Sequence, residues 1–260
     1  GGVRLIMATI KRFADYCDQE GIELSDRNFT LEYESNIPAR VGLAGSSAII
    51  TATIRALRQF FGVEIPKHIQ PNLVLSAEVD ELGIAAGLQD RVIQTYQGLV
   101  YMDFNRELMQ RQGYGYYEEL DHTKLPPLYV AYQTDLSEGS EIVHTNLRER
   151  FSRGDPDVVR AMQRFAEITV EAKQALAEGN FKRLSELMNE NFDLRASIVP
   201  LRQADLRLVH TGRRVGASSK FAGSGGAVIG TYDGTPEMLQ KLIDAYKEIG
   251  AEVIVPKVIK

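Results

Sequence analysis

A run of small residues is the first feature that could do chemistry. Segment 36–48 reads NIPARVGLAGSSA and leads into a predicted helix. Gly42 and Gly45 can adopt a positive φ and let a ligand approach the backbone. Ser46 and Ser47 lie at the expected helix N-terminus, where unpaired N–H groups attract an anion such as a phosphate. The same residues also suit a simple strand-to-helix turn with a serine cap, and the Walker pattern, GxxxxGK followed by Ser or Thr, is absent.

Two carboxylates follow this segment along the chain. Glu78 lies among apolar neighbours, and Asp90 follows a Gly-Leu-Gln turn. Near a bound phosphate, such a pair suits phosphoryl transfer, because one acid can hold Mg²⁺ while the other positions or deprotonates the attacking hydroxyl. Without a phosphate site nearby, acids of this kind are ordinary surface residues.

A cluster of glycines near the C-terminus is the third candidate. Gly223, Gly225 and Gly226 precede a predicted strand rather than opening a helix, so they do not match the dinucleotide-binding pattern. A glycine loop can still bring its backbone close to another loop or to a phosphate.

The composition narrows the class of protein. The chain has 260 residues, 44% of them hydrophobic, and a net charge of −5, which argues against a general nucleic-acid-binding protein. No apolar run reaches the roughly 20 residues of a membrane span, and the first residues do not resemble a secretory signal. Cys17 is the only cysteine, so we expect a buried structural thiol in a reducing, cytoplasmic environment. The four histidines lack metal-ligand spacing.

The apolar pattern predicts helices and strands that do not alternate regularly, which is typical of an α+β fold rather than a Rossmann or TIM arrangement. The predicted helices cover residues 3–20, 48–61, 71–81, 204–215 and 235–249. The predicted strands cover residues 29–35, 98–104, 128–134, 227–232 and 252–256. Asp155 with Pro156, and later Asn180, mark two more helix starts, the first helix ending at Gly179. We expect domains at 1–124 and 125–260.

Several motifs resemble those of the GHMP kinases, which are named for galactose, homoserine, mevalonate and phosphomevalonate. Pro38 with the run Gly42 to Ala48 resembles their phosphate loop, and Lys220 to Gly226 resembles their C-terminal glycine motif. The pair Ala44-Gly45 departs slightly from the usual Leu-Gly pair. Segments 75–78, 87–91, 98–104 and 125–128 are similar to plant-type glucuronokinases. The resemblance therefore extends through nearly the whole chain.

This resemblance implies a two-domain GHMP kinase fold, with a ribosomal S5-like first domain that binds ATP and a ferredoxin-like second domain. It also implies a role for each matching residue. The ATP phosphates would lie against the backbone of Gly42, Leu43, Ala44, Gly45, Ser46, Ser47 and Ala48. Ser47, or else Ser46, would coordinate Mg²⁺ together with Glu78, and Asp90 would be the catalytic aspartate. The phosphate loop would be stabilised, and the sugar pocket lined, by Gly223, Ser224, Gly225 and Gly226. Arg91 and Lys220 are candidates for pairing with a substrate carboxylate, or else are structural charges.

The implied reaction is phosphorylation of a sugar by ATP at the anomeric hydroxyl, with D-glucuronate as the leading acceptor. A kinase for a heptose phosphate and a catalytically silent sugar sensor are the alternatives, although the presence of Glu78 and Asp90 favours an active enzyme. The expected partners are thus ATP and a small sugar, without nucleic acid or membrane. GHMP kinases begin with a P-G-R-V-N-L-type segment that has no counterpart here. We therefore expect a preceding segment in the natural protein, and an exposed apolar sheet face in residues 1–260 alone.

Overall fold

The computed structural model describes residues 2–133 and 141–259, which form two compact units. The first unit comprises Gly1–Ile37, Ala44–His122 and Val258–Lys260, and the second comprises Pro38–Leu43 and Thr123–Lys257. The short segment Pro38–Leu43 therefore belongs with the second unit, although the residues on both sides of it belong to the first. The sequence pattern gave no indication of this exchange.

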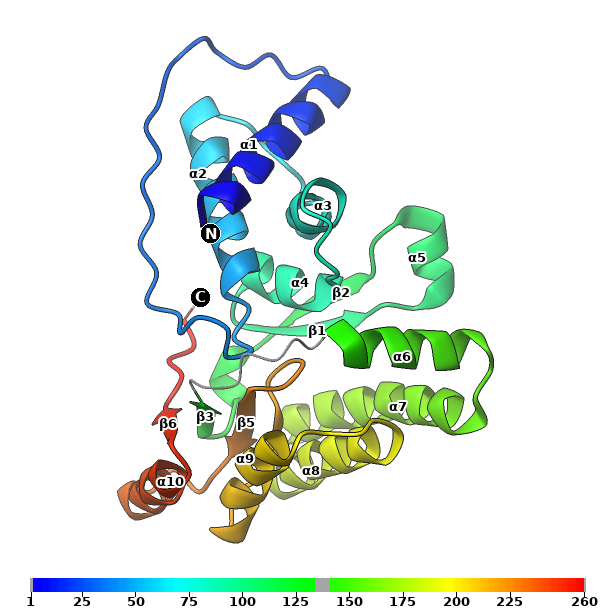
Figure 1. Cartoon of the computed structure of the whole chain (residues 1–260), viewed down its shortest axis with the longest axis vertical. Coiled ribbons are helices and arrows are strands. Elements are labelled where there is room, and N and C mark those ends of the chain that lie inside the picture. The colour runs from blue at the N-terminus through cyan, green and yellow to red at the C-terminus, as the bar shows by residue number, and fades with distance from the viewer. Residues whose placement is uncertain (1, 134–140, 260) are drawn as a thin grey trace. The chain divides into compact units, whose positions relative to one another are not determined.

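The first unit is mainly helical (Figure 1). Its helices are α1 (Gly2–Gln19), α2 (Gly45–Phe61), α3 (Gln70–Ser76), which continues as a π-helical turn (Ala77–Glu81), α4 (Leu88–Tyr96) and α5 (Arg106–Gln112). Strands β1 (Leu99–Asp103) and β2 (Tyr116–Leu120) pair antiparallel, with Leu99 opposite Leu120 and Asp103 opposite Tyr116. A short 3₁₀ turn, His122–Lys124, follows β2.

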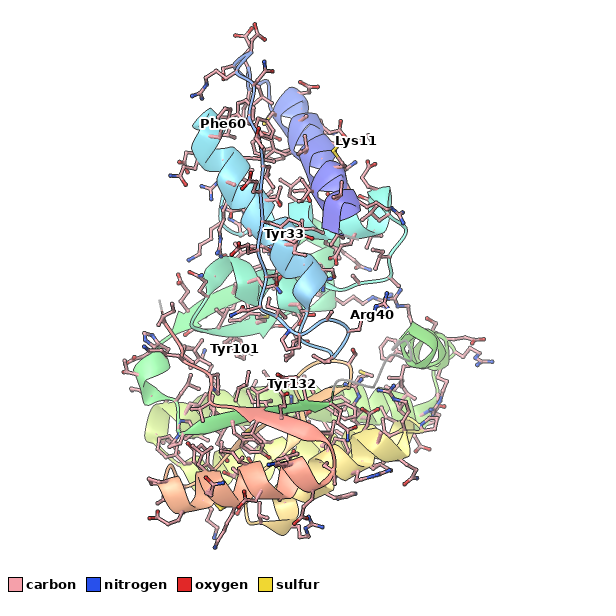
Figure 2. All side chains as sticks on the ribbon, turned by 60° about the vertical axis from the view of Figure 1, so that its left-hand side comes forward. Lys11, Tyr33, Arg40, Phe60, Tyr101 and Tyr132 are labelled. Carbon is pink, nitrogen blue, oxygen red and sulfur yellow. The ribbon has the colours of Figure 1, made fainter. Side chains whose placement is uncertain are left out.

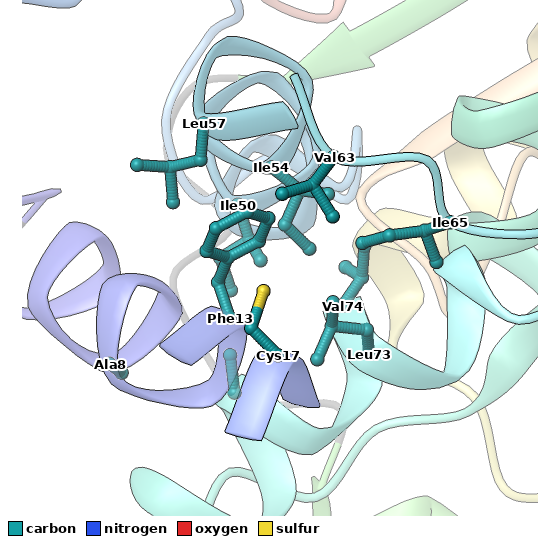
Figure 3. Close-up of a cluster of buried hydrophobic side chains, with 11 residues drawn as sticks. Ala8, Phe13, Cys17, Ile50, Ile54, Leu57, Val63, Ile65, Leu73 and Val74 are labelled. Carbon is teal, nitrogen blue, oxygen red and sulfur yellow. The ribbon is translucent and has the colours of Figure 1, made fainter. Parts of the chain in front are cut away.

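One apolar core joins α1, α2 and α3 (Figure 3). Phe13 and Cys17 from α1 pack with Ile50 and Ile54 from α2 and with Val74 from α3. The Cys17 thiol is fully buried in this core, as its place on the apolar face of a helix predicts.

Two predictions for the first unit need correction. Segment 29–35 is not a strand, because no neighbouring strand pairs with it in the described part of the chain. Phe29 instead packs on Phe60, at 5.3 Å between ring centroids. Phe60, which Figure 2 labels, lies near the end of α2. The predicted helix 71–81 does form, but it widens into the π-helical turn at Ala77.

The second unit contains a four-stranded antiparallel sheet in the order β4-β5-β3-β6. Figure 1 labels three of these strands, β3, β5 and β6. The elements of the second unit in chain order are β3 (Leu128–Gln133), α6 (Glu141–Ser152), α7 (Pro156–Glu178), α8 (Phe181–Ile198), α9 (Gln203–Arg214), β4 (Lys220–Phe221), β5 (Ala227–Thr231), α10 (Pro236–Glu248) and β6 (Ala251–Ile254). This is the β-α-β-β-α-β order of a ferredoxin-like domain, with four helices in the first crossover. The ferredoxin-like prediction is confirmed. Thr134, the last residue of the predicted strand 128–134, lies outside the described residues.

The predicted helix ends in the second unit are also confirmed. The Asp155 side chain accepts hydrogen bonds from the backbone of Asp157 and Val158, and Gly179 ends α7 in the left-handed conformation. Asn180 caps α8 and Thr235 caps α10 in the same way as Asp155. None of the helices in the described residues is long and apolar enough to cross a membrane.

Candidate active site

The loop before α2 has an unusual backbone. Arg40, Gly42 and Ala44 have positive φ values of 62°, 78° and 52°, and Figure 2 labels Arg40 on this loop. Gly45 does not take the positive φ that the sequence suggested, because it is already the first residue of the helix. Ala44 takes the left-handed conformation in its place, as the N-cap of α2.

The two serines at the start of α2 point to different partners. Ser46 is an exposed residue, and its hydroxyl donates to Oε1 of Glu78 at 3.1 Å. The Ser47 hydroxyl is buried and donates to the carbonyl of Ala44 at 3.1 Å. Neither serine is the N-cap, and the N-cap Ala44 makes no side-chain cap hydrogen bond, so the simple serine-cap interpretation is wrong. The first N–H groups of α2 are therefore left to bind an anion.

Glu78 is a fully buried carboxylate in the π-helical turn. Arg91 in α4 donates to its Oε2 from Nε at 2.8 Å and from Nη2 at 2.5 Å. A buried charge needs such compensation, and the bidentate guanidinium provides it. The Oε1 atom, which carries the hydrogen bond from Ser46, faces the start of α2. The pair thus connects α4 to the N-terminus of α2.

Asp90 lies beside this pair, in the first turn of α4. Its side chain is 44% exposed, and its Oδ2 is 3.3 Å from Nη1 of Arg91. Asp90 can therefore meet a ligand as an acceptor of a hydrogen bond or a proton.

Gln94, one helical turn after Asp90, was not predicted from the sequence. Its side-chain Nε2 donates to the carbonyl of Ala44 at 3.0 Å. The spacing of four residues from Asp90 is a signal for a shared helix face, which could have been read once α4 was recognised.

The glycine loop, residues 222–226, contacts the Pro38–Leu43 segment within the second unit. A Cβ added at Gly42 would lie 2.0 Å from the carbonyl oxygen of Gly225, and one added at Gly226 would lie 3.0 Å from that of Val41. Val41 is buried there against Tyr132 of β3, which Figure 2 labels, and against Ala227. Close backbone packing thus requires glycine at these positions.

Two side chains hold the glycine loop from α8 and α9. Arg195 donates to the carbonyls of Gly223 at 3.1 Å and Ser224 at 3.3 Å. The buried carboxylate of Asp205 accepts from the N–H of Gly226 at 3.0 Å. These contacts give the loop a defined shape.

Lys220 lies next to this loop, on β4. Its Nζ donates to the carbonyl of Phe221 at 2.7 Å. Desolvation by burial, followed by repulsion from Arg195, lowers the pKa of Lys220 to about 8. Arg91 and Lys220, the two predicted partners of a substrate carboxylate, therefore lie in different units, and each already has a protein partner.

The first unit thus brings together Ser46, Glu78, Asp90 and Arg91, and the second unit brings together Gly42, Gly225 and Gly226. The described residues contain no group of three His, Cys, Asp or Glu side chains that could hold a metal ion unaided. A surface cavity of about 450 Å³, lined among others by Asp157 and Arg164, includes none of these site residues.

Comparison with known proteins gives matches over nearly the whole chain. A family model described as "GHMP kinases N terminal domain" matches residues 4–98. Probable glucuronokinase 2 of Arabidopsis thaliana is 43% identical over 256 residues, which cover 96% of this chain and 69% of that protein. D-glycero-alpha-D-manno-heptose 7-phosphate kinase of Campylobacter jejuni is 22% identical over 165 residues, which cover 64% of this chain and 48% of that protein.

The fold has solved counterparts as well. The crystal structure of Streptococcus pneumoniae phosphomevalonate kinase superposes with a TM-score of 0.75 at 16% identity, covering 98% of this chain and 82% of that chain. The likeness concerns the fold alone, and it confirms the predicted α+β class.

Proposed function

Because the chain belongs to the GHMP kinase family, we propose that it transfers a phosphoryl group from ATP to a sugar acid. The observation that supports this most is the 43% identity to a probable glucuronokinase over 96% of the chain. The proposed acceptor is D-glucuronate, phosphorylated on its anomeric hydroxyl to give glucuronate 1-phosphate. Because ATP is the donor, we also propose a cytoplasmic location.

The start of α2 is the proposed binding site for the ATP phosphates. The backbone from Gly42 to Ala48 would surround them, and the first N–H groups of α2 would donate hydrogen bonds to their oxygens. The positive end of the helix dipole adds to this attraction. The lack of a side-chain cap on Ala44 supports the proposal, because a cap would occupy these donors.

Mg²⁺ would be held by Ser46 and Glu78. The Ser46 hydroxyl and Oε1 of Glu78 lie 3.1 Å apart, and this pair of oxygens fits an ion that prefers one carboxylate together with phosphate oxygens. We propose Ser46 rather than Ser47 for this role, because the Ser47 hydroxyl is buried and donates to Ala44. When bound, the ion would neutralise charge on the transferring phosphate.

Asp90 would act on the acceptor. An exposed carboxylate at the start of α4 can orient the attacking hydroxyl and take its proton. Arg91 would support this carboxylate and keep Glu78 in place. Within the second unit, the glycine loop would hold the backbone of Val41 and Gly42 in place.

A coupled ATPase assay tests the proposal, with the protein in its natural full length and a panel of sugar acids, neutral sugars and heptose phosphates. We expect the highest kcat/KM with D-glucuronate and, by phosphorus NMR, a product with phosphate on the anomeric carbon. Higher kcat/KM with a heptose phosphate would favour the second candidate, which the similarity to the Campylobacter jejuni kinase supports. Nucleotide binding without turnover of any sugar would favour a silent sensor.

A further inference from the structure

The carbonyl of Ala44 accepts hydrogen bonds from both α2 and α4 in the first unit. Ala44 has φ 52° and ψ 39°, the left-handed conformation that residues other than glycine, asparagine and aspartate seldom adopt. Such a conformation persists where the surrounding contacts determine it. The contacts that hold Ala44 in the left-handed conformation therefore also orient the Ala44–Gly45 peptide, which leads into α2.

Three donors meet this carbonyl oxygen. The Ser47 hydroxyl is at 3.1 Å and the Ala48 N–H is at 3.2 Å, and both belong to α2 itself. The third donor is Nε2 of Gln94 at 3.0 Å, which reaches in from α4. Gln94 thus adds a tertiary contact to the two local ones.

The chemistry of the amide fixes how Gln94 is oriented. A carbonyl oxygen can only accept, so the amide must turn its NH₂ group toward Ala44. Its Oε1 then faces Thr51 on α2, whose hydroxyl is 3.5 Å away. Arg55, one turn further along α2, donates to the backbone carbonyl of Gln94. Both the side chain and the backbone of this residue are therefore bound to α2.

Gln94 shares its helix face with the proposed acceptor-side residues. Asp90 and Arg91 precede it by four and three residues, a spacing that puts all three on one side of α4. Arg91 reaches the start of α2 through Glu78 and Ser46, while Gln94 reaches it directly.

We propose that Gln94 is a positioning residue of the kinase: its side-chain amide orients the Ala44–Gly45 peptide and thereby aims the first N–H groups of α2 at the nucleotide phosphates. The inference rests on the proposed function, because those N–H groups are the proposed phosphate donors. Gln94 touches neither substrate in this scheme and acts through Ala44.

Gln94→Glu is the decisive variant, because it keeps the shape of the side chain but cannot donate to Ala44 when ionised. The measurement is the binding of Mg·ADP by calorimetry, which needs no acceptor sugar. It is made at pH 8, where the introduced glutamate is to be ionised. We expect the Kd to rise about tenfold. The variant loses the hydrogen bond to Ala44, and it also sets a carboxylate oxygen against the Ala44 carbonyl oxygen, which repel each other. In the coupled assay, the KM for ATP should rise by a similar factor while kcat changes less than threefold.

Two further variants complete the test. Gln94→Met removes the donor without adding charge and should raise the Kd by a smaller factor. Gln59→Glu makes the same chemical change at an exposed position of α2 and should leave the Kd unchanged. Wild-type Mg·ADP affinity in folded Gln94→Glu, or a loss matched by collapse of the thermal midpoint in both Gln94 variants, would overturn the proposal. If the wild type turned over no sugar acid but the Gln94 effect on ADP binding held, the acceptor assignment would fail and the positioning role would stand.

Discussion

Glu78 has no exposed surface, whereas 44% of the Asp90 side chain is exposed, although both carboxylates contact the same arginine. Removing the charge of Glu78 would leave Arg91 buried without its main partner, and breaking such a pair costs about 3–5 kcal/mol of stability. A Glu78 variant would therefore mix a loss of metal binding with a loss of folding. Asp90 and Ser46 are better places to test the chemistry, because both reach the surface.

Asp90→Asn should lower kcat and leave the protein folded. The amide keeps the shape of the carboxylate and some hydrogen bonding, but it cannot accept a proton, and general-base assistance contributes about 10²–10⁴-fold in rate. The contact with Arg91 is 3.3 Å long and partly exposed, so its loss should change the thermal midpoint little. The check is kcat, the KM for ATP and the thermal midpoint on one preparation. A near-normal kcat would remove Asp90 from the catalytic residues.

Ser46→Ala and Ser47→Ala form a matched pair. Ser46→Ala removes the proposed metal ligand, so the Mg²⁺ concentration for half-maximal rate should rise. It also removes the hydrogen bond to the buried Oε1 of Glu78, so the thermal midpoint should fall as well. Ser47→Ala removes a buried hydrogen bond to Ala44, which should cost about 1 kcal/mol in unfolding free energy with little change in Mg²⁺ dependence. Titrating Mg²⁺ against rate for both variants separates the roles. The opposite pattern would return the metal to Ser47.

At the scale of elements, sequence reasoning succeeded where a local rule was sufficient. Asp155 and Thr235 cap helices because their side chains accept from N–H groups two or three residues on, a preference that the residues themselves carry. Sequence reasoning failed where the local conformation depends on contacts with segments that are distant in the sequence. Segment 29–35 has an alternating pattern but no strand to pair with in the described residues. Gly45 permits a positive φ, yet Ala44 adopts it, and the Ala44 carbonyl accepts a hydrogen bond from Gln94 of α4.

The candidate site divides in the same way. Motif resemblance placed Glu78 and Asp90 near the start of α2, but it could not separate Ser46 from Ser47, because their side-chain directions depend on where α2 begins. Gln94 belongs to none of the recognised motifs. Its hydrogen bond to the Ala44 carbonyl depends on the packing of α4 against α2, which the sequence does not show.

The packing of the loop before α2 on the glycine loop leads to a prediction for Gly42→Ala. The added Cβ would lie 2.0 Å from the Gly225 oxygen, and the residue would also have to hold φ 78°. Both backbones would have to move, so we expect a loss of about 3 kcal/mol or more in unfolding free energy. Gly21→Ala is the control, because φ there is 68° and nothing lies within 4 Å of the new Cβ. It should cost only about 1 kcal/mol.

Denaturant unfolding of the two glycine variants measures this difference. If Gly42→Ala lost no more stability than Gly21→Ala, the two loops would have room to separate, and the required contact at Gly225 would be disproved.

For the molecule as a whole, the predicted site residues divide between the two units, and the phosphate loop itself changes unit between Leu43 and Ala44. Variants of this loop must therefore be judged by the stability of both units. Lys220 offers a way to follow the second unit alone, because its charge is desolvated there.

Lys220 should make the stability of the second unit depend on pH. In the unfolded chain a lysine keeps its proton up to a pKa of about 10.4, whereas burial lowers the folded pKa of Lys220 to about 8. Between these values the unfolded chain binds more protons than the folded one, so this residue makes the unfolding free energy rise with pH. Below pH 8 the protonated Lys220 lowers the unfolding free energy by the full effect of the pKa shift, which is at most about 3 kcal/mol.

Lys220→Met should therefore gain stability relative to wild type at pH 7 and lose that advantage progressively toward pH 10. Thermal midpoints of both proteins across this range provide the measurement, and Lys182→Met, at an exposed position on α8, controls for the removal of a charge. A constant difference between Lys220→Met and wild type from pH 7 to 10 would mean that Lys220 keeps an ordinary lysine pKa in the folded protein.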